Sequence, residues 1–312
     1  MNRTQRTLAA LAGERTDRPP VSFWRHLDPR LDAAAQHAAF YEETGVDFIK
    51  IMHDGLPVAF ADLRGAAELT PEGAYAQAAL ERARRVTDAL VGEAPTYFNV
   101  FSPFCLLRRV MPDEAIAQAV RCDEQGVAAA LDAAGRTLGC LCGRLIRQAG
   151  CLGVFVCFQG NEQGRFSKEV FDRVVRPSDW AVLEAANAAS NENIAHFCGW
   201  DGIPNVLSRC ADYPAKAVNW AISVEKLGLS DGRRLFGGRP VLGGFDNRRG
   251  SLLYTATEDE IKRETHRILA DYRAREGSLN GLLVGADCSF LPPIASERFR
   301  YVVEAVREEA VL

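Results

Sequence analysis

The feature of this sequence that most limits its possible folds is a regular alternation of two kinds of segment. Short runs rich in β-branched and aromatic residues, bounded by Gly, Pro or Asp, are typical of strands. Longer stretches rich in Ala, Glu and Arg lie between them and are typical of helices. The expected strands are residues 20–25, 46–52, 95–101, 153–158, 193–198, 216–222, 240–245 and 281–286. Eight strands that are each followed by a helix predict a (β/α)8 barrel, the TIM-barrel fold.

An open, doubly wound sheet is the alternative arrangement for alternating strands and helices. We favour the barrel because the strands number eight and no G-x-G-x-x-G motif follows the first of them. The 312 residues contain no low-complexity linker and no break in composition. We therefore expect a single α/β domain over residues 1–312. Residues 1–18 are expected to add an N-terminal helical extension ahead of the barrel.

Several helix ends can be predicted from capping residues. Thr70-Pro71-Glu72 offers an N-cap, a proline for the first helical position and an acid for the first turn. Thr257 and Glu260 have the spacing of a capping box, and Gly277 suits the end of that helix. The stretch 113–149 is long enough to hold more than one helix.

Composition and charge exclude several classes of protein. The chain is 47% hydrophobic and 25% charged, as in an ordinary globular protein. Its net charge of −4 argues against a dedicated nucleic-acid binder, which would be basic. No apolar run approaches the ~18 residues of a membrane span, and the N-terminus is polar, so we expect neither membrane association nor a secretory signal. In the cytoplasm, the expected compartment, the nine cysteines are better explained as buried thiols or metal ligands than as disulfides.

Polar residues at the ends of the expected strands form a pool of candidate site residues, because barrel enzymes carry their chemistry there. The candidates for catalysis are Asp54, which ends the second strand, and His53, whose side chain titrates near neutral pH. The candidates for substrate binding are Arg25, Gln159, Asn219 and Asp246. Packing, capping and rim salt bridges are the alternative explanations for each of these residues.

The most specific pattern at the strand ends is His196-Phe197-Cys198. Side chains two apart on a strand point the same way, so His196 and Cys198 can face the barrel mouth together. Imidazole and thiolate groups are preferred zinc ligands, and Cys288 at the end of the last strand can supply a third. Three protein ligands with one open position are typical of catalytic zinc. The alternative is that these cysteines are small core residues, which is what we expect of Cys105 and Cys157.

Four stretches follow one another in a characteristic order along almost the whole chain: residues 11–21, 48–54, 240–253 and 292–299. In that order they resemble the uroporphyrinogen decarboxylase superfamily. The first is similar to the approach to that family's first strand, and the second to a strand that ends in an aspartate. The resemblance implies a TIM barrel.

The superfamily has two main chemistries, cofactor-free decarboxylation of a porphyrinogen and zinc-dependent methyl transfer with a corrinoid protein. The methyltransferase branch carries zinc on His-x-Cys and a distant Cys, a pattern similar to His196, Cys198 and Cys288 here. The resemblance therefore implies a methyltransferase that moves a methyl group between a small O-, S- or N-methyl compound or a thiol and a corrinoid. A separate partner protein would supply the corrinoid, since this chain has no spare domain for it. Families of this kind are commonly dimeric, which leaves a homodimer open.

Two other functions remain as alternatives. A decarboxylase-like lyase would act on a tetrapyrrole or another anionic substrate, and Asp54 matches the pyrrole-binding aspartate of that branch in position. However, that branch carries an Arg-Gln-Ala-Gly-Arg run after its first strand, and residues 25–30 here depart from it after Arg25. A non-catalytic binding protein, with its cysteines as plain core, is the third alternative.

Overall fold

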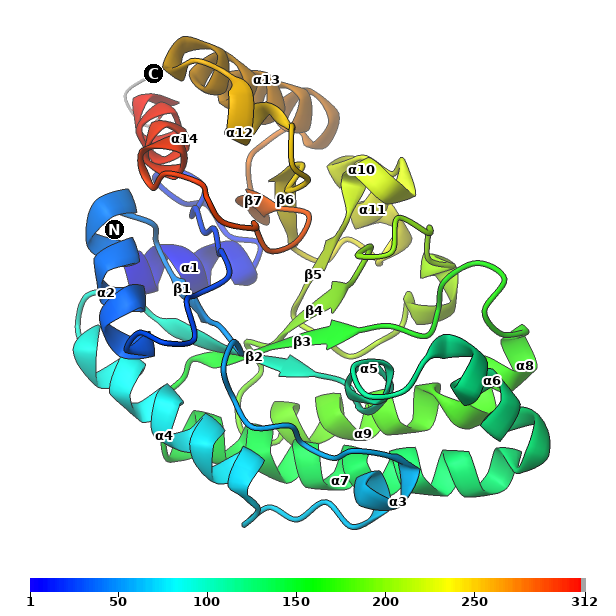
Figure 1. Ribbon diagram of the computed structural model, residues 1–312. Coiled ribbons are helices and arrows are strands. Elements are labelled where there is room, and N and C mark those ends of the chain that lie inside the picture. The colour runs from blue at the N-terminus through cyan, green and yellow to red at the C-terminus, as the bar shows by residue number, and fades with distance from the viewer. Residues whose placement is uncertain (310–312) are drawn as a thin grey trace.

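The computed structural model, which describes residues 1–309, contains one parallel sheet wrapped by helices (Figure 1). Seven strands lie side by side in the order of the chain, from β1 to β7. Their bounds are β1 Ile49–Ile51, β2 Thr96–Phe101, β3 Gly153–Phe158, β4 Ile194–Phe197, β5 Ala217–Trp220, β6 Val241–Phe245 and β7 Leu282–Ala286. Each overlaps one of the expected strands, so seven of the eight strand predictions are confirmed.

Residues 20–25, expected to form the first strand, make isolated bridges instead of a strand. Val21 pairs with Val284 of β7, and Arg25 pairs with Phe290 farther on. Hydrogen bonding to side chains explains the interrupted ladder. The amide of Val21 donates to the Asp47 carboxylate at 2.8 Å, and the Ser22 hydroxyl donates to the Phe48 carbonyl. The expectation of a regular strand at this place is therefore wrong.

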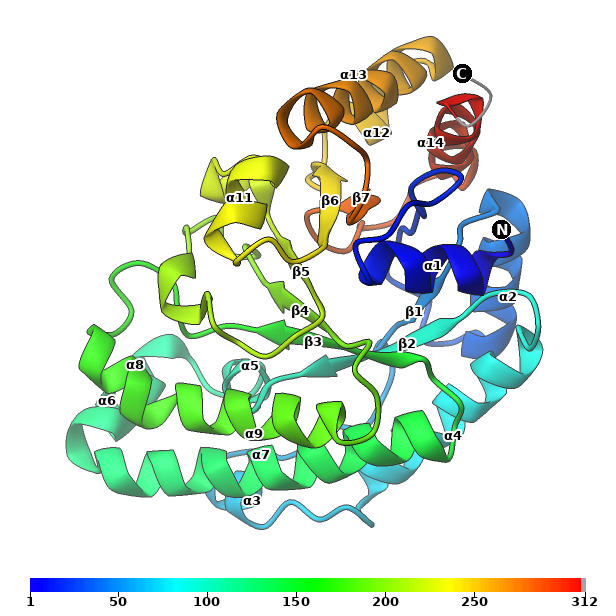
Figure 2. The same cartoon turned by 180° about the vertical axis from the view of Figure 1, so that it is seen from behind.

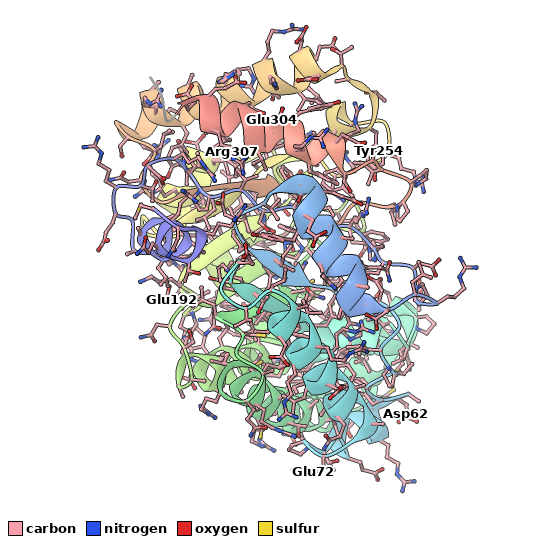
Figure 3. The ribbon with its side chains drawn as sticks, turned by 90° about the vertical axis from the view of Figure 1, so that its left-hand side faces the viewer. Asp62, Glu72, Glu192, Tyr254, Glu304 and Arg307 are labelled. Atoms are coloured by element: carbon pink, nitrogen blue, oxygen red, sulfur yellow. The ribbon has the colours of Figure 1, made fainter. Side chains whose placement is uncertain are left out.

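Helices cover the outside of the sheet. Their bounds are α1 Arg3–Leu11, α2 Ala33–Thr44, α3 Leu63–Ala67, α4 Ala74–Ala89, α5 Pro103–Arg108, α6 Asp113–Cys122, α7 Glu124–Arg147, α8 Lys168–Val174, α9 Arg176–Asn187, α10 Ile222–Glu225, α11 Leu229–Leu235, α12 Leu252–Thr255, α13 Glu258–Glu276 and α14 Glu297–Glu308, with a 3₁₀ turn at Leu207–Cys210. Figure 2 shows α7 and α9 side by side across one face, and Figure 3 shows α2 and α4 together with α14 nearby. Within residues 1–309, no helix combines the length and the apolar character that crossing a membrane requires.

The capping predictions have different outcomes. Thr257 and Glu260 form a complete capping box at the start of α13, and Gly277 ends that helix in the left-handed conformation. The stretch 113–149 does hold two helices, α6 and α7. The predicted cap at Thr70 is wrong, because the Thr70 carbonyl accepts a hydrogen bond from Gly73 in a turn and α4 begins only after it.

Alternation along the strands separates an outer core from an inner one. In β3, Val154, Val156 and Phe158 belong to the core between sheet and helices. Phe155 belongs to a separate cluster on the concave side. That inner cluster comprises Ala10, Leu11, Trp24, Phe48, Met52, Tyr97, Phe155, Ile194, Ala217, Leu242 and Leu283. It closes the amino-terminal side of the curled sheet, with α1 contributing Ala10 and Leu11.

Above most of this apolar layer lies a polar one. On five strands, the residue two positions after a member of the inner cluster also faces inward. These residues are Lys50, Asn99, Cys157, His196 and Asn219. All five are buried. Cys157, His196 and Asn219 are Cα partners across β3, β4 and β5, and Lys50 and Asn99 line the same cavity as Cys157 and His196.

Candidate metal and substrate site

A cavity of about 290 Å³ opens at the carboxyl ends of the strands. Its walls include residues from β1 to β4 and from the loops that follow the strands. Among them are Lys50, Asp54, Asn99, Cys157, Gln159, His196, Cys198 and Cys288. The cavity therefore contains most of the polar layer and all three residues expected to bind zinc.

His196 is held in one orientation by Asn219 on the neighbouring strand. The two residues are Cα partners in the β4–β5 pair, and His196 Nδ1 lies 2.5 Å from Asn219 Oδ1. Asn219 Nδ2 donates to the carbonyls of Leu242 and Ala286, so its Oδ1 faces His196 as an acceptor. Nδ1 must then carry the ring proton, which leaves Nε2 with a free lone pair. That tautomer is the one a metal-binding histidine needs.

Three cysteines lie close to His196, and a fourth packs against two of them. The ligand atoms of Cys157, His196 and Cys198 all lie within 4.8 Å of one another. Cys288 is not in that group of three, but its Sγ lies 3.6 Å from His196 Nε2. Cys105, at the start of α5, packs against Cys157 and Cys198.

Contacts between the thiols keep them protonated when no metal is bound. Hydrogen bonding with Cys105 is the largest effect on Cys157 and raises its pKa well above the usual value. Hydrogen bonding with Cys157 does the same for Cys198. Hydrogen bonding with Cys198, followed by burial, raises the pKa of Cys288 to about 12. Ionisation of these thiols therefore requires a cation, and metal binding would release their protons.

The donor set fits zinc. With Zn–S of about 2.3 Å and Zn–N of about 2.0–2.1 Å, two ligands at a tetrahedral angle lie about 3.6 Å apart. The separation of Cys288 Sγ and His196 Nε2 is also 3.6 Å. His196, Cys198 and Cys288 are therefore suitably placed to hold the ion together, and Cys157 is close enough to take part.

Lys50 is an unusual neighbour for such a site. The residue is only 4% exposed, and its Nζ lies 4.7 Å from the centroid of the Trp24 ring and 4.0 Å from that of Phe155. Within residues 1–309, no hydrogen bond or ion pair to this Nζ is found. Burial lowers the pKa of Lys50, while the neighbouring cysteines, Cys288 first among them, act in the opposite direction. The amine thus depends on nearby anions to hold its charge.

Asp54 and His26 form a second polar pair at the mouth of the cavity. His26 Nδ1 lies 2.7 Å from Asp54 Oδ1, and the amide of Leu27 donates to Oδ2. Burial works to raise the pKa of Asp54, but the hydrogen bond and the charge of His26 outweigh it, so the pKa is lowered. Asp54 is therefore a carboxylate that orients His26 and holds its second nitrogen toward the cavity.

His53 lines the cavity as a neutral, packed side chain. Its Nε2 lies 3.2 Å from the Tyr75 hydroxyl, and its ring packs edge-on against Phe101. Burial, followed by the charge of Arg109, lowers the pKa of His53 to about 3. A side chain with this pKa does not exchange a proton near neutral pH, which argues against the expected acid–base role of His53.

The residues expected to bind substrate do not all lie at the cavity. Gln159 lines the cavity. Asn219 is fully buried beneath it, and its side chain contacts His196 instead. Arg25 donates to the Ile294 carbonyl, and Asp246 pairs with Arg248, so neither side chain reaches the cavity.

Sequence reasoning missed the cavity roles of Cys157, Cys105 and Lys50. Cys157 and Cys105 were expected to be plain core, but both line the cavity. No local sequence signal could have found Cys157, because its place depends on how two strands pair. It is the Cα partner of His196 in the β3–β4 pair, and the same register places Phe158 beside Phe197.

Comparison with known proteins identifies the family. The profile of the uroporphyrinogen decarboxylase (URO-D) family matches residues 42–309. The chain belongs to the uroporphyrinogen decarboxylase family. None of the curated proteins matches the sequence.

A solved structure shares this fold. A methyltransferase from Methanosarcina mazei is 17% identical to this chain and superimposes on it with a TM-score of 0.79. The alignment covers 100% of both chains. An Old Yellow Enzyme from a Pichia species is 14% identical, with a TM-score of 0.43 over 88% of this chain and 82% of that one. The methanogen protein thus shares the uroporphyrinogen decarboxylase fold along the full chain.

Proposed function

We propose that this family member is a zinc-dependent methyltransferase that moves a methyl group between a small methyl compound or thiol and a corrinoid. The observation that carries the proposal is the cluster of His196, Cys198 and Cys288 at the cavity, with the Nε2 of His196 free to bind. The fold shared with a methanogen methyltransferase supports it. A homodimer and a separate corrinoid-carrying partner protein are part of the same proposal.

Zinc, when bound, would act as a Lewis acid on the heteroatom that gains or loses the methyl group. The chain's own residues have four tasks around it. His196, Cys198 and Cys288 would hold the ion, and Asn219 would fix the imidazole. Gln159 would orient the substrate in the cavity, and the His26–Asp54 pair would exchange a proton with the substrate heteroatom.

We further propose that residues 20–25 close the curled sheet by occupying the eighth strand position of a (β/α)8 barrel, the single domain of residues 1–312. The amide of Ser22 donates to the Val284 carbonyl of β7, and the amide of Asp47 donates to the Val21 carbonyl on the other side. A backbone linked to both edges of a parallel sheet is what closure requires.

A decarboxylase-like lyase is the second candidate, because one observation favours it. Arg109 lines the cavity, as Asp54 does, and its guanidinium lies 4.9 Å from the centroid of the Phe101 ring. Within the described residues it has no carboxylate partner, so it could bind a substrate carboxylate.

A methyl-transfer screen distinguishes the two candidates. The zinc-loaded protein is mixed with cob(I)alamin and a panel of O-, S- and N-methyl compounds, and methylcobalamin formation is followed by absorbance. We expect one donor class to react with the wild type and not with Cys198→Ala. If no donor reacts in either direction while an anionic tetrapyrrole loses CO₂, the lyase is the correct assignment.

A further inference from the structure

Cys157 is the thiol in this cavity that neither the sequence pattern nor the proposed function accounts for. It is buried in β3 and is the Cα partner of His196 on β4. Neighbouring strands in register direct such partners to the same face of the sheet. Cys157 and His196 therefore face the same cavity, and Cys198, two residues after His196, completes the compact group of ligand atoms within 4.8 Å.

We infer that Cys157 is a fourth, exchangeable ligand of the proposed zinc site, completing a set with His196, Cys198 and Cys288. This inference rests on the proposed zinc-dependent function and extends it. Three cysteines and one histidine form an ordinary tetrahedral zinc site. All four of these residues line the cavity.

The charge of Lys50 supports a third thiolate. A zinc ion with two thiolates and a neutral histidine has no net charge, so a buried ammonium beside it would be uncompensated. A third thiolate gives the metal site a charge of −1, which the ammonium of Lys50 neutralises. Uncompensated buried charge is costly, and within residues 1–309 no carboxylate pairs with Lys50.

Cys105 is the one other thiol of the cluster, and its position differs. It belongs to α5, where its amide donates to Ser102 at the helix start, and it contacts Cys157 from outside the strand layer. It is not in the compact group around His196. Cys105 therefore provides a matched control, since it is a buried cysteine of the same cavity.

Exchange at Cys157 explains how a site with four protein ligands can still accept a substrate. Catalytic zinc sites keep one position open, whereas closed sites are structural. When the substrate is a thiol, it takes the place of Cys157 and gives its proton to the departing Cys157 thiolate. One S–H bond breaks and one forms, so the number of thiolates and the total charge stay the same.

X-ray absorption at the zinc edge tests the assignment without measuring activity. For the zinc-loaded wild type we expect three sulfur ligands and one nitrogen ligand. Cys157→Ala should lose one sulfur, and 2-mercaptoethanol should restore it, while Cys105→Ala should match the wild type. We also expect the zinc affinity of Cys157→Ala, measured against a competing chelator, to fall at least about 10-fold.

The outcomes separate this inference from the proposed function. Two sulfur ligands in the wild type, unchanged in Cys157→Ala, would overturn the role of Cys157 and leave the site of His196, Cys198 and Cys288 intact. A wild type that binds no zinc would overturn both. Loss of a sulfur in Cys157→Ala that 2-mercaptoethanol does not restore would overturn the exchange.

Discussion

Replacing Asn219 by alanine should weaken zinc binding although Asn219 touches neither the cavity nor the metal. Its Oδ1 lies 2.5 Å from His196 Nδ1, and both residues are almost completely buried. Without this acceptor the imidazole can rotate or adopt the other tautomer, which removes the Nε2 lone pair from the site. Removal of such a partner typically costs 10–100-fold in metal affinity, or about 1.4–2.8 kcal/mol.

The same substitution also has a cost in stability that must be measured separately. Asn219 Nδ2 donates to the carbonyls of Leu242 and Ala286 at 2.8 and 3.0 Å. Leaving a buried polar group unsatisfied costs about 1–3 kcal/mol, so the free energy of unfolding should fall by a few kcal/mol. Asn161→Ala is the matched control, because Asn161 is also buried and donates to a backbone carbonyl, that of Val206.

Competition with a zinc chelator measures the affinity, and chemical denaturation of the metal-free proteins measures the stability. We expect both variants to be destabilised and only Asn219→Ala to lose zinc affinity. If Asn219→Ala binds zinc as tightly as the wild type, the role assigned to this hydrogen bond is refuted. Equal loss of affinity in Asn161→Ala would show that general destabilisation is the cause.

Three further substitutions test other parts of the account. Asp54→Asn removes the charge that orients His26, so the rate of methyl transfer at saturating donor should fall about 10²-fold or more; an unchanged rate would exclude the pair from catalysis. Burial raises the pKa of Asp179 to about 8, so the folded protein retains a proton that the unfolded chain loses above about pH 4. The contribution of Asp179 to stability should therefore fall as the pH rises from 4 to 8, by roughly 4 kcal/mol at pH 7, and Asp179→Asn should raise the Tm more at pH 8 than at pH 5; an equal effect at both pH values would contradict this. A Cβ at Gly232 would lie 2.1 Å from the Trp220 ring, so Gly232→Ala should lower the free energy of unfolding by about 1–3 kcal/mol in urea; an unchanged midpoint would show that the ring has room to move.

Most of the sheet could be predicted from the sequence because its strands are buried on both faces. Such strands form short, nearly continuous apolar runs, as Gly153–Phe158 does. Residues 20–25 have a similar composition, yet the Asp47 carboxylate accepts the Val21 amide that a ladder would use. A contact between residues so far apart in sequence leaves no local pattern.

The candidate site also has some parts that a local sequence pattern predicts and others that depend on contacts between distant residues. The pairing of His196 with Cys198 depends only on alternation within one strand, and the sequence contains it. The approach of Cys157 depends on the register between β3 and β4, which the sequence alone does not reveal. Arg25 occupies a strand end as expected, but the Ile294 carbonyl, far along the chain, turns its guanidinium away from the cavity.

The zinc content of the purified protein tests the central claim most directly. Elemental analysis should find about one zinc per chain in the wild type, with loss in His196→Ala and Cys198→Ala. Cys151→Ala is the control that should retain zinc, because Cys151 is buried outside the cavity, near Thr87. A wild type without zinc, even after zinc is added back, would contradict the account.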